Sequence, residues 1–267
     1  MNAAQPIGDL LRDWRQRRRM SQLDLACDAE ISTRHLSFVE TGRAQPSREM
    51  VLRLAERLEV PLRERNALLV AAGYAPIFRE RALADPALDA ARKAVDVVLA
   101  GHEPYPALAV DRHWNLVVAN AAATRLMAGV DERLMGPPLN VLRLSLHPGG
   151  LAPRIANLPE WRAHLLARLR RQADVSADPR LAELLQELAA YPLPAGTRSA
   201  RTAADPPYAG VVVPLQLVIA TGTLSFVSTT TVFGTPVDIT LSELALESFF
   251  PADAATAEAL RAMAQTA

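Results

Sequence analysis

Residues 32–43 carry the polar and cationic side chains that are best suited to bind another molecule. Arg34 stands out, because its guanidinium can donate two hydrogen bonds to O6 and N7 of one guanine, worth about 1–3 kcal/mol of discrimination between bases. Thr33 and His35 flank it, and Phe38 follows one helical turn later. Side chains of these types at the start of one helix indicate readout of a DNA major groove.

Two short helices joined by a tight turn must position these side chains. Ser21 can cap a first helix over residues 22–28, and Ser32 can cap a second helix over residues 33–40 that stops at Gly42. The predicted inward residues are Leu23, Leu25 and Ala26 in the first helix and Ile31, Leu36 and Val39 in the second. This arrangement is a helix-turn-helix, a motif that binds DNA.

The stretch SQLDLA..AEIS....LSFVETGR resembles the lambda-repressor-like helix-turn-helix of the xenobiotic-response-element family of bacterial regulators. This resemblance implies that Gln22 opens the first motif helix and contacts the phosphate backbone or a base edge. It also implies that Thr33 and Arg34 face bases. Thr41 and Arg43 are implied to touch phosphates.

The same resemblance implies an ion pair between Arg15 and Glu40 that would orient the arginine toward the DNA backbone, with two separate solvated charges as the alternative. Three more arginines, at 17–19, continue a basic run beside the motif, which favours phosphate contact over a merely solvated face. Residues 1–75 hold 12 arginines against 10 acidic residues, so the positive excess is local. The predicted DNA-binding residues are Arg15, Gln22, Ser32, Thr33, Arg34, His35, Phe38, Thr41 and Arg43.

Five helices are predicted to form the first domain. One precedes the motif, and two more begin at Pro46 and Pro61. The apolar stripe of the first helix consists of Ile7, Leu10, Leu11 and Trp14, and leaves Arg12, Arg15 and Arg18 more exposed. We therefore assign residues 1–76 to a DNA-binding domain, 77–86 to a linker and 87–267 to a second domain.

The second domain is predicted to combine strands with helices. A connecting helix over residues 86–101 could belong to it or to a dimer contact, and periodicity does not separate these. Strands over 107–111 and 114–119, followed by a helix from Asn120, are typical of the start of a PAS-type domain. Further predicted elements are helices near 159–173 and 178–190, strands over 211–220, 223–233 and about 238–247, and a C-terminal helix capped by Asp253. Pro214 places the first of these strands at a sheet edge or bulge.

The predicted fold class is therefore α+β, with an all-α five-helix lambda-repressor-like domain followed by a PAS-like antiparallel sheet domain with helices. The second domain resembles the ligand-binding domain of MmyB-like regulators. The segments that carry this resemblance are VDRHWNLVVANAAA, LNVLRLSLHPGG, NLPEWRAHLLARLRRQ, DPRLAELLQELAAYP and GTLSFVSTTTVFGTPVDITLSELALESFFPADAATAEALR. The resemblance implies a buried pocket that can hold a fatty acid or a similar amphipathic ligand.

Apolar side chains of the second domain could line such a pocket, or could form plain core. They are Leu126, Met127, Leu142, Leu144, Leu146, Trp161, Leu165, Phe226, Val227 and Phe233. Arg143 and His147 are the nearest candidates to hold an acidic headgroup, because a carboxylate in an apolar site needs a charged or hydrogen-bonding partner. Either could instead be a satisfied structural group. A PAS-type domain can also hold haem or flavin, and His147 would be the candidate haem ligand.

The sequence favours no catalytic chemistry. Its five histidines lack the HExxH or paired spacing of zinc sites, and neither a Walker loop nor a GxSxG elbow occurs. The single cysteine, Cys27, allows no intramolecular disulfide, and we expect a small core residue there, with a redox-sensing thiol as the alternative. Charges near the N-terminus and the lack of 18 consecutive apolar residues predict a cytoplasmic protein without a membrane partner. We expect no required cofactor.

These observations predict a transcription regulator that binds double-stranded operator DNA and is not an enzyme. One motif contacts too few bases to be selective, so we expect a homodimer that reads two half-sites about 34–36 Å apart. The second domain is expected to sense a small apolar or amphipathic ligand such as a fatty acid. The alternative is a second domain that serves only for dimerisation or protein interaction.

Overall fold

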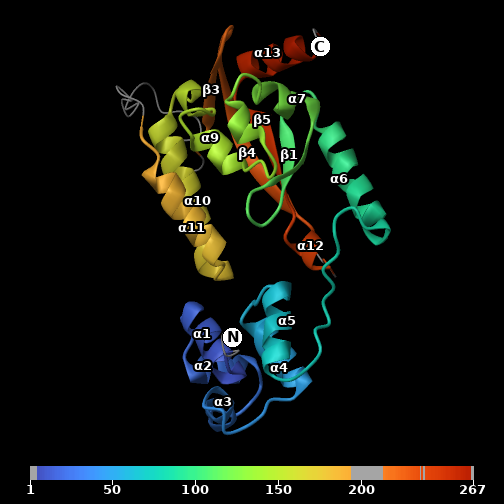
Figure 1. Cartoon of the computed structure of the whole chain (residues 1–267), viewed down its shortest axis with the longest axis vertical. Helices are drawn as coiled ribbons and strands as arrows, with labels where there is room; N and C mark the ends of the chain where they lie inside the picture. Colours follow the sequence, from blue (N-terminus) through green and yellow to red (C-terminus); the bar gives the residue numbers. More distant parts are fainter. Residues whose placement is uncertain (1–4, 194–212, 235, 237, 266–267) are drawn as a thin grey trace. The chain divides into compact units, whose positions relative to one another are not determined.

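The computed structural model describes residues 5–193, 213–234, 236 and 238–265. Its contacts divide the chain into two compact units (Figure 1). Of the described residues, the helical unit contains 5–81 together with 174–177, 236 and 238–242, and the sheet unit contains the others. The boundary at residue 81 falls within the segment assigned to the linker. The two short later segments differ from the contiguous second domain that the sequence predicts.

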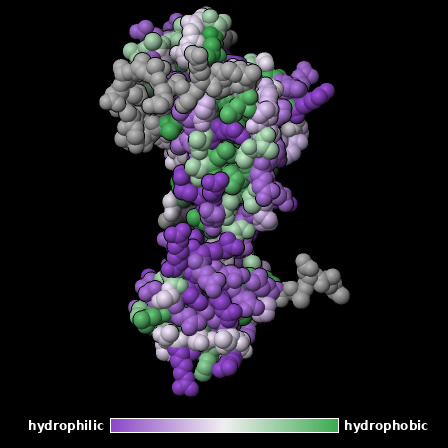
Figure 2. Space-filling model, turned by 90° about the vertical axis from the view of Figure 1, so that its left-hand side faces the viewer, coloured by the Kyte–Doolittle hydropathy of each residue, from purple (hydrophilic) through white to green (hydrophobic). Residues whose placement is uncertain are grey.

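Five helices account for residues 7–71 of the helical unit, as the sequence predicts. They are α1 (Ile7–Arg17), α2 (Gln22–Asp28), α3 (Thr33–Glu40), α4 (Arg48–Arg57) and α5 (Leu62–Ala71). The hydroxyl groups of Ser21, Ser32 and Ser47 accept hydrogen bonds from backbone N–H groups in the first turns of α2, α3 and α4, and so fix where each begins. The apolar stripes meet in one core, and the face of this unit seen in Figure 2 is largely hydrophilic.

Two residues of α2 lie on the side opposite to the predicted one. Leu23 is 60% exposed and Cys27 is exposed, whereas Leu25 and Ala26 are buried. Residues two positions apart on a helix point about 200° apart, because one turn takes about 3.6 residues. Burial of Leu25 therefore turns Leu23 and Cys27 to the surface, and the predictions of an inward Leu23 and a core Cys27 are wrong.

An antiparallel five-stranded sheet organises the sheet unit, with the strand order β2-β1-β5-β4-β3. The strands are β1 (Ala107–Val110), β2 (Leu116–Ala119), β3 (Leu215–Ile219), β4 (Gly222–Val232) and β5 (Ala245–Pro251). Pro214 directly precedes the edge strand β3, where the missing N–H group costs no sheet hydrogen bond.

Helices cover both faces of this sheet (Figure 1). Leu108 and Val110 of β1 belong to the large core formed with α7 (Ala121–Leu126), α9 (Val141–Leu146), α10 (Leu158–Ser176), α11 (Pro179–Ala190) and α13 (Ala254–Gln265). Ala107 and Ala109 point to the other face, where α6 (Asp89–Gly101) packs. The remaining short helices are η1 (Pro86–Leu88), α8 (Glu132–Met135), η2 (Ala152–Arg154) and α12 (Ile239–Ser242). The predicted α+β class is confirmed.

The last strand differs from its predicted range. Residues 238–247 do not form one strand, because the Asp238 carboxylate accepts a hydrogen bond from the Thr240 N–H group and begins the helical turn α12. The strand β5 starts later and continues to Pro251. The predicted Asp253 cap is present, since its side chain accepts a hydrogen bond from the Thr256 N–H group at 2.7 Å.

Candidate functional site

The outer side of α3 gathers most of the predicted DNA-binding side chains. Arg34 and Arg43 are exposed, and their guanidinium carbons lie 5.3 and 6.0 Å from the ring centroid of Phe38. Both distances suit cation–π contacts, so one aromatic ring organises two cations on one surface. The remaining predicted residues here are Ser32 and Thr41, which are exposed, and Thr33 and His35, which are half-buried.

A buried carboxylate joins α3 to the two preceding helices. Arg15 donates from Nε and Nη2 to the two carboxylate oxygens of Glu40, at 2.7 and 2.9 Å. Gln22 donates to Oε2 at 2.8 Å, and Arg12 donates to the Glu40 backbone carbonyl at 2.6 Å. The Glu40 side chain is fully buried, and the ion pair that the family resemblance implied is present.

The electrostatics of Glu40 follow from this surrounding. Burial alone would raise the pKa of Glu40, but hydrogen bonds from Arg15 and Gln22 together with the charges of Arg15 and Arg12 outweigh burial and lower it. The pKa of Arg15 is raised, chiefly by the hydrogen bond to Glu40. The pair is therefore fully ionised at neutral pH.

Arginines in and near the basic run form hydrogen bonds within the helical unit, which the sequence does not predict. Arg15 also donates to the Met20 carbonyl, and Arg18 donates to the carbonyl groups of Leu58 and Glu59. Arg12, Arg15 and Arg18 are half-buried, because each long side chain donates hydrogen bonds to acceptors within the unit. Arg17 and Arg19 are the exposed members of the run.

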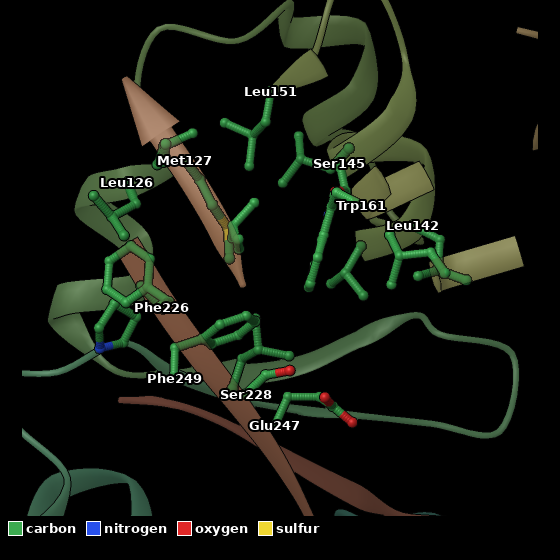
Figure 3. A pocket seen from close by; sticks show the side chains of 18 of the residues that line it. Leu126, Met127, Leu142, Ser145, Leu151, Trp161, Phe226, Ser228, Glu247 and Phe249 are labelled. Atoms are coloured by element: carbon green, nitrogen blue, oxygen red, sulfur yellow. The ribbon is translucent and has the colours of Figure 1, made fainter. Parts of the chain in front are cut away.

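An apolar cavity of about 100 Å³ lies in the sheet unit between the sheet and the helices of its large core (Figure 3). Of the side chains proposed from the sequence, seven line it: Leu126, Met127, Leu142, Leu144, Trp161, Leu165 and Phe226. Phe249, from β5, lies across the cavity from Met127 and was not among the predicted residues. Helix and strand residues that are far apart in the sequence thus line one cavity.

Arg143 and His147 do not line the cavity. Arg143 donates to both carboxylate oxygens of Glu187 at 2.8 and 2.7 Å, because position 143 of α9 faces α11. His147 accepts a hydrogen bond at Nδ1 from the Gly149 N–H group, and its ring meets that of Tyr191 edge-on. Burial and a hydrogen bond to Glu187 raise the pKa of Tyr191 to about 12, so the Tyr191 hydroxyl keeps its proton at neutral pH.

Three further predicted residues lie elsewhere in the core. Leu146 belongs to the large core beside the cavity, and Val227 pairs with Phe250 in the sheet, but neither lines the cavity. Phe233 packs on the opposite face of the sheet, against the cluster that includes Val95 of α6. These placements correct the predicted lining of the pocket.

The polar end of the cavity was missed in the sequence. Arg168 of α10 donates to Glu247 of β5 from Nη1 and Nη2, at 3.0 and 2.6 Å, and its guanidinium carbon lies 4.5 Å from the centroid of the Trp114 ring. Thr230 accepts from Arg168 and donates to Glu247. Arg168 follows Trp161 by seven positions and Leu165 by three, so helical spacing was the available signal.

Residues 91–263 match the family model of the MmyB-like transcription regulator ligand binding domain, and residues 6–68 match a helix-turn-helix domain. The first match spans more than half of the chain. The chain belongs to the MmyB-like transcription regulators. A comparison with curated proteins finds no match.

The two matched domains of this MmyB-like regulator correspond to the two sites described above. The helix-turn-helix match contains α3 and the Glu40 cluster, and the ligand-binding match contains the cavity with its polar end. These are the domains of a DNA-binding transcription regulator. Among the described residues, no helix is long and apolar enough to cross a membrane, and no three His, Cys, Asp or Glu side chains form a group that could hold a metal ion.

Proposed function

We propose that this MmyB-like regulator binds a two-fold-symmetric operator as a homodimer and that an amphipathic small molecule of the fatty-acid size class, held in the cavity, controls this binding. The observation that carries the ligand proposal is a cavity of about 100 Å³ with apolar walls and one polar end, inside the matched ligand-binding domain. Ligand sites in proteins commonly combine mostly apolar walls with a few polar groups that fix orientation.

The DNA proposal assigns distinct roles to the two cations around Phe38. Arg34 lies in the first turn of α3, where a recognition helix meets base edges, and we assign it to base readout together with Thr33. Arg43 lies just beyond the end of α3, and we assign it to phosphate contact. The Glu40 cluster would hold α3 at a fixed angle to α1 and α2.

Two arginine variants test these roles on DNA from the region upstream of the protein's own coding sequence. Arg34→Ala is expected to weaken the binding free energy for the preferred site by about 1–3 kcal/mol and to relax base preference at one position. Arg43→Ala is expected to weaken binding to all sequences similarly and to reduce the salt slope by about 1. Binding of labelled site libraries at several salt concentrations measures both effects. Uniform weakening by Arg34→Ala would contradict base readout.

The dimer is tested on the same DNA. A homodimer predicts that a duplex with one half-site loses most of the affinity of the full site, and that half-site spacing must keep about one helical turn. Equal affinity for single and paired half-sites would contradict it.

Ligand binding is tested without assuming a headgroup. Denaturing extraction of the purified protein, followed by mass spectrometry, is expected to release a single-chain lipid from the cavity. Addition of the same compound should change operator affinity at fixed salt. An empty cavity together with unchanged operator affinity would favour a domain that serves only for dimerisation or protein interaction.

A further inference from the structure

The polar end of the cavity holds a cation and an anion that already neutralise each other. Arg168 and Glu247 are the charged side chains among the described residues that line the cavity, and their two hydrogen bonds are 3.0 and 2.6 Å long. The Glu247 side chain is 5% exposed and that of Arg168 is 25% exposed. A pair this close and this poorly hydrated interacts strongly, so neither charge is available to a second partner without loss.

Two other side chains also contact the Arg168 guanidinium. Thr230 accepts one of its hydrogen bonds, and the Trp114 ring covers one face. Three of the five N–H groups are therefore engaged in the bonds to Glu247 and Thr230. The remaining N–H groups can still donate a hydrogen bond, but the positive charge is compensated.

A hydroxyl group beside this pair is available to a ligand. Ser228 lines the cavity next to Glu247 (Figure 3), and its side chain makes no hydrogen bond to another described residue. It also lines an adjoining hollow of about 170 Å³, together with Arg168, Thr230 and His164. A serine hydroxyl can donate one hydrogen bond and accept two.

Among residues 5–193, 213–234 and 238–265, no second cation lines the cavity to compensate for a buried ligand anion. Burial lowers the pKa of His164, and the charges of Arg168 and Arg171 lower it further, so its imidazole is neutral near pH 7. Arg171 is exposed and lines neither space. A ligand carboxylate would thus be buried beside the carboxylate of Glu247, which is costly because like charges repel and both lose water.

We infer that the ligand of this cavity carries an uncharged hydrogen-bonding end, such as an alcohol or an amide, which binds Ser228 and the remaining N–H groups of Arg168, and that the site disfavours a free carboxylate. This inference rests on the proposed function, since it specifies the headgroup of the ligand proposed there. It also explains why the polar end contains paired charges and a hydroxyl in place of an unpaired arginine.

Three ten-carbon probes with matched chains test the headgroup on the full-length protein freed of co-purified lipid. Decanol, decanamide and decanoate are titrated at about pH 7, where decanoate is ionised, and dissociation constants are measured by calorimetry. Decanol and decanamide are expected to bind at least about tenfold more tightly than decanoate, a difference of about 1.4 kcal/mol. Decanoate binding equal to or tighter than the neutral probes overturns the inference alone. No binding of any probe overturns the proposed ligand function with it.

Glu247→Gln supplies the decisive variant, because it keeps the side-chain shape and removes the anion that neutralises Arg168. The affinity for decanoate is then expected to rise at least about tenfold relative to the affinity for decanol. Glu187→Gln is the matched control, since it breaks the Arg143 ion pair outside the cavity and should leave the ranking unchanged. An unchanged ranking in Glu247→Gln overturns the inference.

Ser228→Ala provides a second readout that does not disturb the ion pair. It should weaken decanol and decanamide severalfold and leave decanoate unchanged, because only the neutral probes are assigned to the hydroxyl. Equal loss for all three probes, or no loss for the neutral ones, contradicts the assigned role of Ser228. Thermal unfolding of each variant without ligand confirms that the fold is retained.

Discussion

Glu40 fixes the position of the proposed recognition surface from inside the helical unit. Its carboxylate accepts hydrogen bonds from Arg15 on α1 and from Gln22 at the start of α2, while its own backbone belongs to α3. A buried ion pair contributes little relative to a well-packed apolar pair, but removal of one partner leaves an uncompensated charge. The cluster therefore makes the geometry of the three helices sensitive to a single side chain.

Glu40→Gln should destabilise the helical unit by about 3–5 kcal/mol, since Arg15 would be left as a largely buried cation without its counter-ion. Urea denaturation at neutral pH measures the change in the free energy of unfolding. Glu56→Gln, which removes an exposed carboxylate of α4, is the control and should change stability by less than about 0.5 kcal/mol. A similar effect of both variants would contradict the structural role of Glu40.

The stability difference between the wild type and the Glu40→Gln variant is expected to depend on pH. The pKa of Glu40 is lower in the folded than in the unfolded chain, where a glutamate titrates near 4.5, so the unfolded state binds the proton more readily. Stabilisation by Glu40 is thus fully present above about pH 4.5 and is lost as the pH falls through its folded pKa. The stability difference between wild type and Glu40→Gln should narrow on acidification below this value. A difference that stays constant there would contradict the lowered pKa.

At the scale of helices and strands, the N-terminal half could be predicted because its signals are local. Ser21, Ser32 and Ser47 each stand directly before a helix, and the apolar residues that follow repeat with the helical period. The start of β5 could not be read in this way. β-branched residues around Ile239 favour a strand, but the cap formed by Asp238 turns the same residues into α12.

The polar end of the cavity escaped prediction for a different reason. Arg168 and Glu247 are 79 positions apart, and only the packing of α10 on β5 brings them together. A charged residue at one isolated position is usually exposed, so neither residue type announces a buried site. Arg143 and His147, which adjoin predicted pocket residues in sequence, face away because neighbouring positions of a helix point about 100° apart.

Close approach of α1 and α3 gives a prediction at the same scale. A Cβ atom added to Gly8 would lie 2.5 Å from the Val39 carbonyl oxygen and 2.7 Å from that of Glu40, so the helices would have to separate. Gly8→Ala should therefore destabilise the unit by about 1–3 kcal/mol, although alanine favours helix formation. Gly101→Ala is the control, because nothing lies within 4 Å of its added Cβ atom and stability should stay the same or rise slightly. Equal effects of the two variants would contradict the close contact.

At the scale of the whole molecule, the chain passes repeatedly between the two units. The cavity strands β4 and β5 are joined through residues 236–242, which belong to the helical unit, and the cavity helix α10 ends in residues 174–177 of the same unit. Any ligand that shifts these cavity walls therefore acts on chain segments that are continuous with the DNA-binding unit. If a ligand controls operator binding as we propose, we expect these segments to couple the two binding events.

Residues 238–240 are held within the helical unit by a buried ion pair and by hydrogen bonds to two backbone carbonyl groups. Arg81 donates to the Asp238 carboxylate at 3.0 Å, Asp238 is 1% exposed, and the Ile239 N–H group donates to the Arg79 carbonyl at 2.8 Å. The hydroxyl of Thr240 donates to the Arg81 carbonyl. We expect these contacts to transmit the effect of ligand binding to the helix-turn-helix.

In allosteric proteins, a ligand typically changes affinity at the second site by about 5- to 150-fold. Arg81→Ala should therefore make the ligand-induced change in operator affinity at least about fivefold smaller. Ligand affinity of the cavity and operator affinity without ligand should each change by less than about threefold, because Arg81 belongs to neither proposed contact surface. Arg79→Ala, which removes an exposed side chain and keeps the backbone bond, is the matched control. Operator titrations with and without ligand measure the coupling, and Arg81→Lys should restore part of it through the retained charge. An unchanged ligand effect in Arg81→Ala would show that coupling runs through α10 or the linker, since the segment 236–242 would then be dispensable for it.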